Sequence, residues 1–142
     1  MPEIIKVLGG GSLLHQVVRD VTTKLDRRFA SFGVTTQQAA LLLSAAGGGS
    51  SPGQLTTVVG TDTAGMTKLL DRLEVKGLIR RRPNPDDRRS MLVEVTEDGL
   101  SLVPELQPVF GEVTSQLFEG FSDEEVASFT SSLRRMRENL QS

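Results

Sequence analysis

A chain of 142 residues with 37% hydrophobic content is long enough to fold as one domain with its own core, although only 4% of its residues are aromatic. The absence of cysteine excludes disulfides, thiolate metal sites and cysteine-based redox sensing, and the single histidine, His15, excludes a multi-histidine zinc site. No segment has the unbroken apolar length of a membrane span, and residues 1–8 are too short for a secretory signal, so we expect a cytoplasmic protein.

The formal net charge of −2 is distributed unevenly along the chain. Residues 68–89 contain eight of the 16 basic side chains, whereas residues 97–142 contain nine acidic and three basic side chains. This asymmetry is typical of a protein that docks on a polyanion through one face.

The first helix is expected to begin at Ser12, a good N-cap residue, after an arm that ends in glycines 9–11. It extends to about Phe32 and carries an apolar stripe at helical spacing. His15 lies beside that stripe, and two interpretations remain open: a polar boundary residue without a role, or a group that lines an effector pocket. The stripe consists of Leu14, Val17, Val18, Val21, Leu25 and Phe29.

Two further helices carry N-terminal capping signals. Thr35 and Gln38 form a capping box before residues 39–46, which are apolar nearly all round and should be buried on several sides. Ser51 at the N-cap, Pro52 at N1 and Gln54 at N3 then predict a short helix that ends at about residue 59. The glycine triplets at 9–11 and 47–49 are interpreted as hinges, because neither matches the spacing of a phosphate-binding loop.

A turn at Gly60 leads into another helix, which begins at Thr61 or Asp62 and stops at Gly77. Two helices joined by a glycine-containing turn indicate a helix-turn-helix, in which the second helix reads the major groove. Residues 78–82 and 91–95 follow as two short strands, and residues 83–87 supply turn chemistry. Basic side chains on this hairpin could enter the minor groove. The arginines at 80, 81 and 82 alternate along a strand, so at most two of them share a face.

The C-terminal third is expected to be helical. An apolar stripe from Leu100 to Leu117 contains Pro104 and Pro108, so we expect this helix to kink, or to restart near Pro108. The last helix begins with Ser122 as N-cap and a capping-box glutamate three residues later. Its apolar seam could be covered by the first helix or by a second subunit, and we favour the second subunit. The seam consists of Val126, Phe129, Leu133, Met136 and Leu140.

The pattern Asp87-x-Arg89-x-x-x-Val93-x-Val95-Thr96 follows the segments Asp-Arg-Leu-Glu at 71–74 and Gly-Leu-Ile-Arg-Arg at 77–81. With Thr-Gln-Gln-Ala-Ala-Leu-Leu-Leu at 36–43 and Ser-Pro-Gly-Gln-Leu at 51–55, it resembles the winged helix of MarR-family transcriptional regulators. The likeness extends over residues 30–100. It implies an α+β, mainly helical fold: an N-terminal arm and dimerisation helix (1–34), a winged helix-turn-helix DNA-binding domain (35–96) and C-terminal dimerisation helices (97–142).

The resemblance also implies roles for individual residues. Asp71 and Asp87 are expected to hold wing arginines in position, Arg89 above all, and a metal cluster at these aspartates is disfavoured because no histidine lies nearby. Ala64 and Gly65 replace residues that are often polar in the family, so specificity is expected to depend on thymine methyl contacts, Thr67, Lys68 and DNA shape. Gly65 indicates either close backbone approach to DNA or plain tolerance of glycine. The predicted DNA-contacting residues are Ser51, Gln54, Thr63, Ala64, Gly65, Thr67, Lys68, Arg72, Arg88 and Arg89.

The predicted function is a homodimeric regulator, expected to act as a repressor, that binds a pseudo-palindromic double-stranded operator and responds to a small aromatic or phenolic effector. The resemblance implies an effector pocket near His15, Arg19, Phe110 and Thr114. No cofactor, metal or membrane is expected, and an enzyme is disfavoured because one histidine and no cysteine cannot assemble a nucleophile, a base and an orienting group. A winged helix that binds protein instead of DNA is the alternative.

Overall fold

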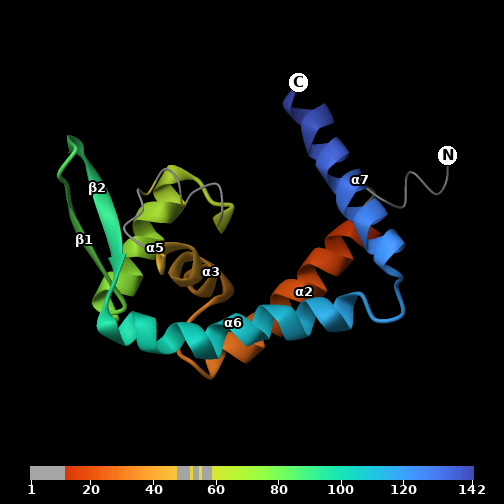
Figure 1. The fold of residues 1–142 in the computed structure, drawn as a ribbon, viewed down its shortest axis with the longest axis horizontal. Coiled ribbons are helices and arrows are strands. Elements are labelled where there is room, and N and C mark those ends of the chain that lie inside the picture. The colour runs from red at the N-terminus through yellow and green to blue at the C-terminus, as the bar shows by residue number, and fades with distance from the viewer. Residues whose placement is uncertain (1–11, 48–51, 53–54, 56–58) are drawn as a thin grey trace.

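The computed structural model describes residues 12–47, 52, 55 and 59–142. In chain order the elements are α2 (Leu13–Ala30), α3 (Thr36–Ala45), α5 (Thr63–Val75), β1 (Ile79–Asn84), β2 (Asp87–Val95), α6 (Glu97–Leu117) and α7 (Asp123–Gln141). Helix α6 forms the base of an open U, with α3, α5 and the hairpin at one end and α7 rising at the other (Figure 1). The predicted mainly helical fold with a β-hairpin wing and N- and C-terminal helices is confirmed.

The helix starts agree with the capping signals in the sequence. Ser12, Thr35 and Ser122 are the N-caps of α2, α3 and α7, and full capping boxes form at Thr35 and Ser122. Of the two candidates for the start of α5, Asp62 is the N-cap. Of the predicted helix at residues 52–59, Pro52, Leu55 and Val59 are helical, whereas Ser51 and Gln54 lie outside the described residues.

One hydrophobic core joins α2, α3, α5, the hairpin and α6. As expected, α3 is buried on several sides, and Leu41 and Leu42 are fully enclosed. Only the C-terminal half of the predicted α2 stripe enters this core, through Leu25 and Phe29. The N-terminal half remains exposed, with Val18 at 58%. The apolar stripe of α2 therefore faces the core in its C-terminal half and the molecular surface in its N-terminal half.

Helix α6 is continuous from Glu97 to Leu117, through both of its prolines. Of the two alternatives expected for this helix, a restart near Pro108 is therefore wrong, and a kink stays a prediction. Pro104 and Pro108 are four residues apart and share one exposed face. The carbonyl groups that lose their N–H partners therefore lie on the solvent side, where water can bind them and the helix can tolerate the loss.

The hairpin is longer and its turn tighter than the sequence pattern indicated. Strand β1 continues through Pro83 to Asn84, and only Pro85 and Asp86 form the turn. The antiparallel register runs from the pair Ile79 and Val95 outward, then shifts between Pro83 and Asn84. Proline is accepted at residue 83 because a two-stranded sheet has only edge strands.

The hairpin base is joined tightly to the first turn of α6. The Thr96 hydroxyl donates to the Gly77 carbonyl at 2.6 Å, and the Thr96 N–H donates to the Leu78 carbonyl at 3.0 Å. A Cβ at the buried Gly99 would lie 2.3 Å from the Leu78 oxygen and 2.5 Å from Val95 Cγ1. Glycine at this position allows the helix to approach the wing base closely.

Gly99→Ala is therefore expected to destabilise the fold by about 1–3 kcal/mol through overpacking against backbone. Urea unfolding followed by circular dichroism measures this loss. Gly111→Ala is the matched control in the same helix, because a Cβ there meets nothing within 4 Å. It should be neutral or stabilising by about 0.5–1 kcal/mol, and equal effects of the two variants would contradict the close-approach account.

Candidate nucleic-acid interface

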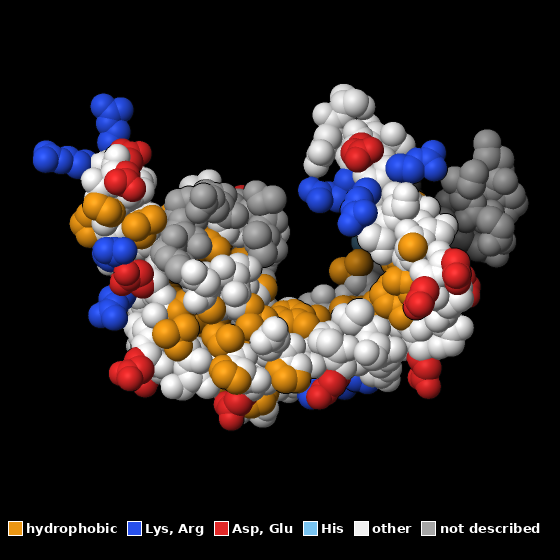
Figure 2. All heavy atoms as spheres, viewed as in Figure 1, with side chains coloured by type: hydrophobic (Ala, Val, Ile, Leu, Met, Phe, Trp, Pro, Cys, Tyr) orange, Lys and Arg blue, Asp and Glu red, His pale blue; other side chains and the backbone are white. Residues whose placement is uncertain are grey.

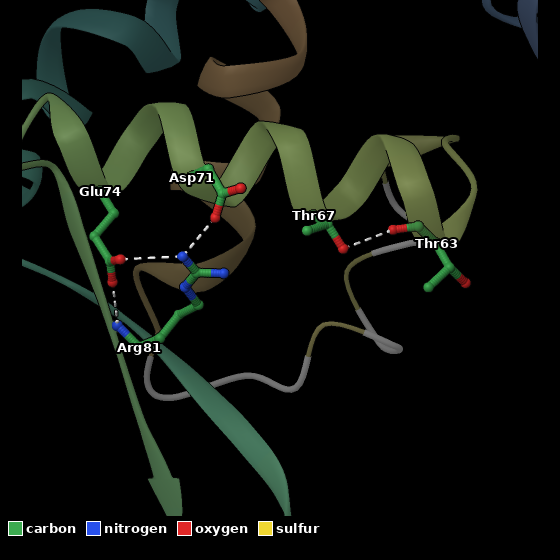
Figure 3. Close-up of polar contacts among 5 residues, drawn as sticks. All are labelled: Thr63, Thr67, Asp71, Glu74 and Arg81. Carbon is green, nitrogen blue, oxygen red and sulfur yellow. Dashed lines mark hydrogen bonds and ion pairs between the residues drawn. The ribbon is translucent and has the colours of Figure 1, made fainter.

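Helix α5 separates its apolar and polar residues onto two faces. Met66, Leu69, Leu70 and Leu73 are buried in the core. The opposite face is exposed, and on it the Thr67 hydroxyl donates to the Thr63 carbonyl at 3.1 Å (Figure 3). The exposed residues of this face include the predicted contacts Thr63, Ala64, Thr67, Lys68 and Arg72.

Gly65 has an intramolecular explanation that the sequence did not provide. Its N–H donates to the Asp62 carboxylate at 2.7 Å, and a Cβ would lie 2.1 Å from the Thr61 hydroxyl oxygen. A side chain here would require Thr61 to rotate away from the N-cap. Close packing at the start of α5 therefore accounts for this glycine without DNA.

Half of the eight basic side chains at residues 68–89 are held by other parts of the protein. Lys76 donates to the Gly33 carbonyl at 2.7 Å and to Gln38 Oε1 at 2.8 Å, which ties the end of α5 to the α2–α3 connection. Arg80 and Arg82 share a face and pair with Glu94, at 3.5 and 2.6 Å. Arg81, on the other face, pairs with Asp71 and Glu74.

The other four basic side chains, Lys68, Arg72, Arg88 and Arg89, are exposed. Among the described residues they have no ion pair and no side-chain hydrogen bond. These are the four basic residues that the sequence analysis selected as DNA contacts. Of the eight basic side chains at residues 68–89, those without a partner among the described residues thus lie on the α5 face and at the hairpin tip.

The hairpin tip presents its basic residues outward. The β1–β2 register leaves residues 88–90 without cross-strand partners. The backbone around them is fixed locally: Asp87 Oδ1 accepts the Arg89 N–H at 3.0 Å, and the Asn84 side chain donates to the Ser90 hydroxyl at 3.1 Å. Basic side chains project from this tip, while hydrophobic side chains lie along the base of the U (Figure 2). The loop is thus held while its arginine side chains remain free.

Asp71 and Asp87, which were expected to hold wing arginines and Arg89 above all, each contact one arginine of the hairpin. Asp71 binds the guanidinium of Arg81, not that of Arg89, because Arg81 lies on β1 directly beside α5. Asp87 holds the backbone of Arg89 and leaves its side chain free. Sequence reasoning also missed Glu74, which joins Asp71 on Arg81. Its spacing three residues after Asp71 on one helix was the available signal.

The residues predicted for an effector pocket lie on α2 and α6, which pack against each other. His15 Nδ1 is 2.8 Å from the Ser12 hydroxyl at the start of α2, and Phe110 packs on Phe29 with ring centroids 4.9 Å apart. A hollow of about 170 Å³ lies between α2 and α6, and one of about 440 Å³ lies beside the end of α5. None of His15, Arg19, Phe110 and Thr114 lines either hollow. The effector pocket therefore stays a prediction.

Two further features of the described residues bear on function. They contain no group of three or more His, Cys, Asp or Glu side chains that could hold a metal ion. No helix among residues 12–47 and 59–142 combines the length and apolar character needed to cross a bilayer.

Comparison with known proteins identifies the family. A family model described as MarR family matches residues 32–90. The multiple antibiotic resistance protein MarR of Salmonella typhimurium is 30% identical over 128 residues, and that of Escherichia coli 28% over 128 residues, each covering 89% of both chains. The crystal structure of an E. coli MarR mutant complexed with operator DNA has a TM-score of 0.81 and 27% identity, covering 93% of this chain and 96% of that chain. The chain belongs to the MarR family of winged helix-turn-helix transcriptional regulators.

Proposed function

We propose that this protein is a homodimeric repressor that binds a pseudo-palindromic operator through α5 and the hairpin, hereafter the wing. The observation that carries the proposal is the division of the eight basic side chains at residues 68–89: four are neutralised internally, and the four on the α5 face and the wing tip have no partner among the described residues. A helix face of this kind fits the major groove, and an arginine at a hairpin tip fits the minor groove. The structure of the E. coli relative complexed with operator DNA supports a DNA-binding role.

Exposed apolar surface supports the homodimer. Helix α7 has no buried residue, and Leu140, Met136 and Phe129 on its seam are 87%, 47% and 43% exposed. On α2, Leu13 and Val18 are 61% and 58% exposed. This exposure supports a second subunit over α2 of the same chain as the partner of the seam, because exposed apolar surface of this kind often marks an interface. In this proposal residues 1–34 and 97–142 form the dimerisation region, and residues 35–96 bind DNA.

A two-fold dimer carries two reading helices and two wings, so it would meet successive major grooves of a pseudo-palindromic site. We further propose that a small aromatic or phenolic molecule lowers the affinity for the operator. The site suggested by family resemblance is near His15, Arg19, Phe110 and Thr114. MarR-family regulators are non-enzymatic, so this regulation would act through binding alone.

The salt dependence of binding tests the proposal directly. Each phosphate neutralised by a basic side chain contributes about −0.9 to the slope of log affinity against log salt. A dimer that uses Lys68, Arg72, Arg88 and Arg89 from both subunits should give a slope steeper than about −4. Fluorescence anisotropy against an operator, identified by sequencing genomic DNA that the purified protein retains, provides the measurement. A flat plot would favour a winged helix that binds protein.

A further inference from the structure

Arg81 bridges the reading helix and the wing. Its Nη2 donates to Asp71 Oδ1 at 2.6 Å and to Glu74 Oε1 at 3.0 Å, and its backbone N–H donates to Glu74 Oε2 at 3.1 Å (Figure 3). Both acceptors lie on α5, whereas Arg81 lies on β1. Arg81 therefore contacts two residues three positions apart on α5, Asp71 through its side chain and Glu74 through both its side chain and its backbone.

The clamp is defined as Arg81 with Asp71 and Glu74. Hydrogen bonds from the Arg81 side chain and backbone lower the pKa of the Glu74 carboxyl, and the two carboxylates raise the pKa of the Arg81 guanidinium. A lowered carboxyl pKa means that the stabilisation is present above the ordinary glutamate range and is lost only as the pH falls through the lowered value. Two carboxylates also outweigh one guanidinium, so the clamp is a poor ligand for a phosphate.

The clamp lies near the base of the wing, so it can control the position of the wing tip. From Arg82 to the tip, every hydrogen bond and ion pair of the described residues lies within the hairpin itself. The base of the wing is also fixed by the buried side chains of Ile79 and Val93 and by the hydrogen bonds of Thr96 beside the first turn of α6. At about 3.4 Å per residue, the strand carries the tip about 10 Å beyond Arg81. A small change in angle at the clamp would therefore move Arg89 by about the length of a hydrogen bond.

We propose that Arg81 is a positioning residue: its bridge from β1 to Asp71 and Glu74 fixes the wing on α5 so that the reading helix and Arg89 engage one DNA site together. This inference rests on the proposed DNA-binding function. It differs from a direct phosphate contact by Arg81, in which Arg81 and Arg89 would act independently. It also differs from a purely stabilising role, which would change the melting temperature and leave the two residues uncoupled.

A double-mutant cycle separates these cases. Glu74→Gln with Arg81→Met removes the clamp while the formal charge of the three residues stays at −1, because one acid and one base are neutralised together. In the parent background, Arg89→Ala should weaken operator binding about ten-fold. The Glu74→Gln, Arg81→Met pair should itself weaken operator binding at least about five-fold. In that background, Arg89→Ala should lower the operator affinity by less than about two-fold. Additive penalties would overturn the proposal.

Arg80→Met with Glu94→Gln is the matched control, because it removes the two ion pairs of Glu94, with Arg80 and with Arg82, which lie within the hairpin. In that background Arg89→Ala should retain its ten-fold penalty, and coupling as strong as that of the clamp variant would overturn the specific role of Arg81. The comparison is made in variants whose melting temperatures match that of the parent.

A measurement without DNA keeps the inference distinct from the proposed function. The 15N order parameters of the amides at residues 86–90 should fall from about 0.85 to below about 0.6 when the clamp is removed. Unchanged order parameters would overturn the proposal even if the parent binds its operator. A parent that does not bind any operator would instead overturn the proposed function.

Discussion

Arg89→Ala is expected to weaken operator binding by at least about ten-fold, equivalent to about 1.4 kcal/mol. Arg89 is exposed at the wing tip, and its side chain has no ion pair or hydrogen bond within the described part of the chain. Its backbone is held by the Asp87 carboxylate, so the guanidinium is free while its base is fixed. Such an arginine can enter the narrow minor groove, where the negative potential is enhanced.

The measurement is a gel-shift titration with the purified protein, accompanied by a sedimentation check that the variant has the same oligomeric state as the parent. Arg82→Ala is the matched control, because Arg82 lies on the same hairpin but pairs with Glu94 at 2.6 Å. The control should bind within about two-fold of the parent, since exposed ion pairs contribute little. Unchanged affinity of the Arg89 variant would refute a minor-groove role for the wing tip.

The helix starts could be predicted from the sequence because capping is a local interaction. At Thr35 and Gln38, and again at Ser122 and Glu125, a side chain and a backbone N–H three residues apart satisfy each other. Both partners are close in sequence, so residue type and spacing contain the necessary information. The same reasoning gave the start of α2 at Ser12.

Features that depend on tertiary surroundings were predicted less well. The tolerance of Pro104 and Pro108 follows from the exposure of their shared face, which depends on how α6 packs against the rest of the fold. The extent of β1 was underestimated because Pro83 suggested a turn, whereas in a two-stranded sheet its missing N–H costs no ladder partner on a third strand.

The candidate site shows the same contrast between local features, which the sequence predicts, and features that depend on tertiary contacts. The residue types and clustering indicated a basic surface, but not which arginines would be neutralised. The pairing of Arg81 with Asp71 and Glu74 depends on β1 folding back beside α5, a contact between residues seven and ten positions apart. Only the three-dimensional structure shows that the Arg81 side chain is paired with carboxylates, whereas the Arg89 side chain has no partner among the described residues.

Phe129→Asp combined with Leu133→Asp is expected to convert the dimer to monomers and to abolish high-affinity operator binding. Both residues lie on the α7 seam, where Phe129 is 43% exposed in the single chain and touches only the Phe118 ring among the aromatic side chains, at 5.8 Å between centroids. In a shared interface each aspartate would be an unpaired charge in apolar surroundings, which costs several kcal/mol. One reading helix and one wing would then contact too few phosphates and bases to hold the operator.

Ala127→Asp combined with Ser131→Asp is the matched control, because these exposed positions add the same charge on the face of α7 opposite to the seam. Analytical ultracentrifugation should show a dimer for this control and monomers for the seam variant, with circular dichroism confirming that both remain helical. Anisotropy titrations on the same samples should then show operator binding by the control alone. A seam variant that stays dimeric would contradict the assignment of α7 to the interface. A monomer that binds a half-site as tightly as the parent binds its operator would show that two-fold docking does not supply the affinity.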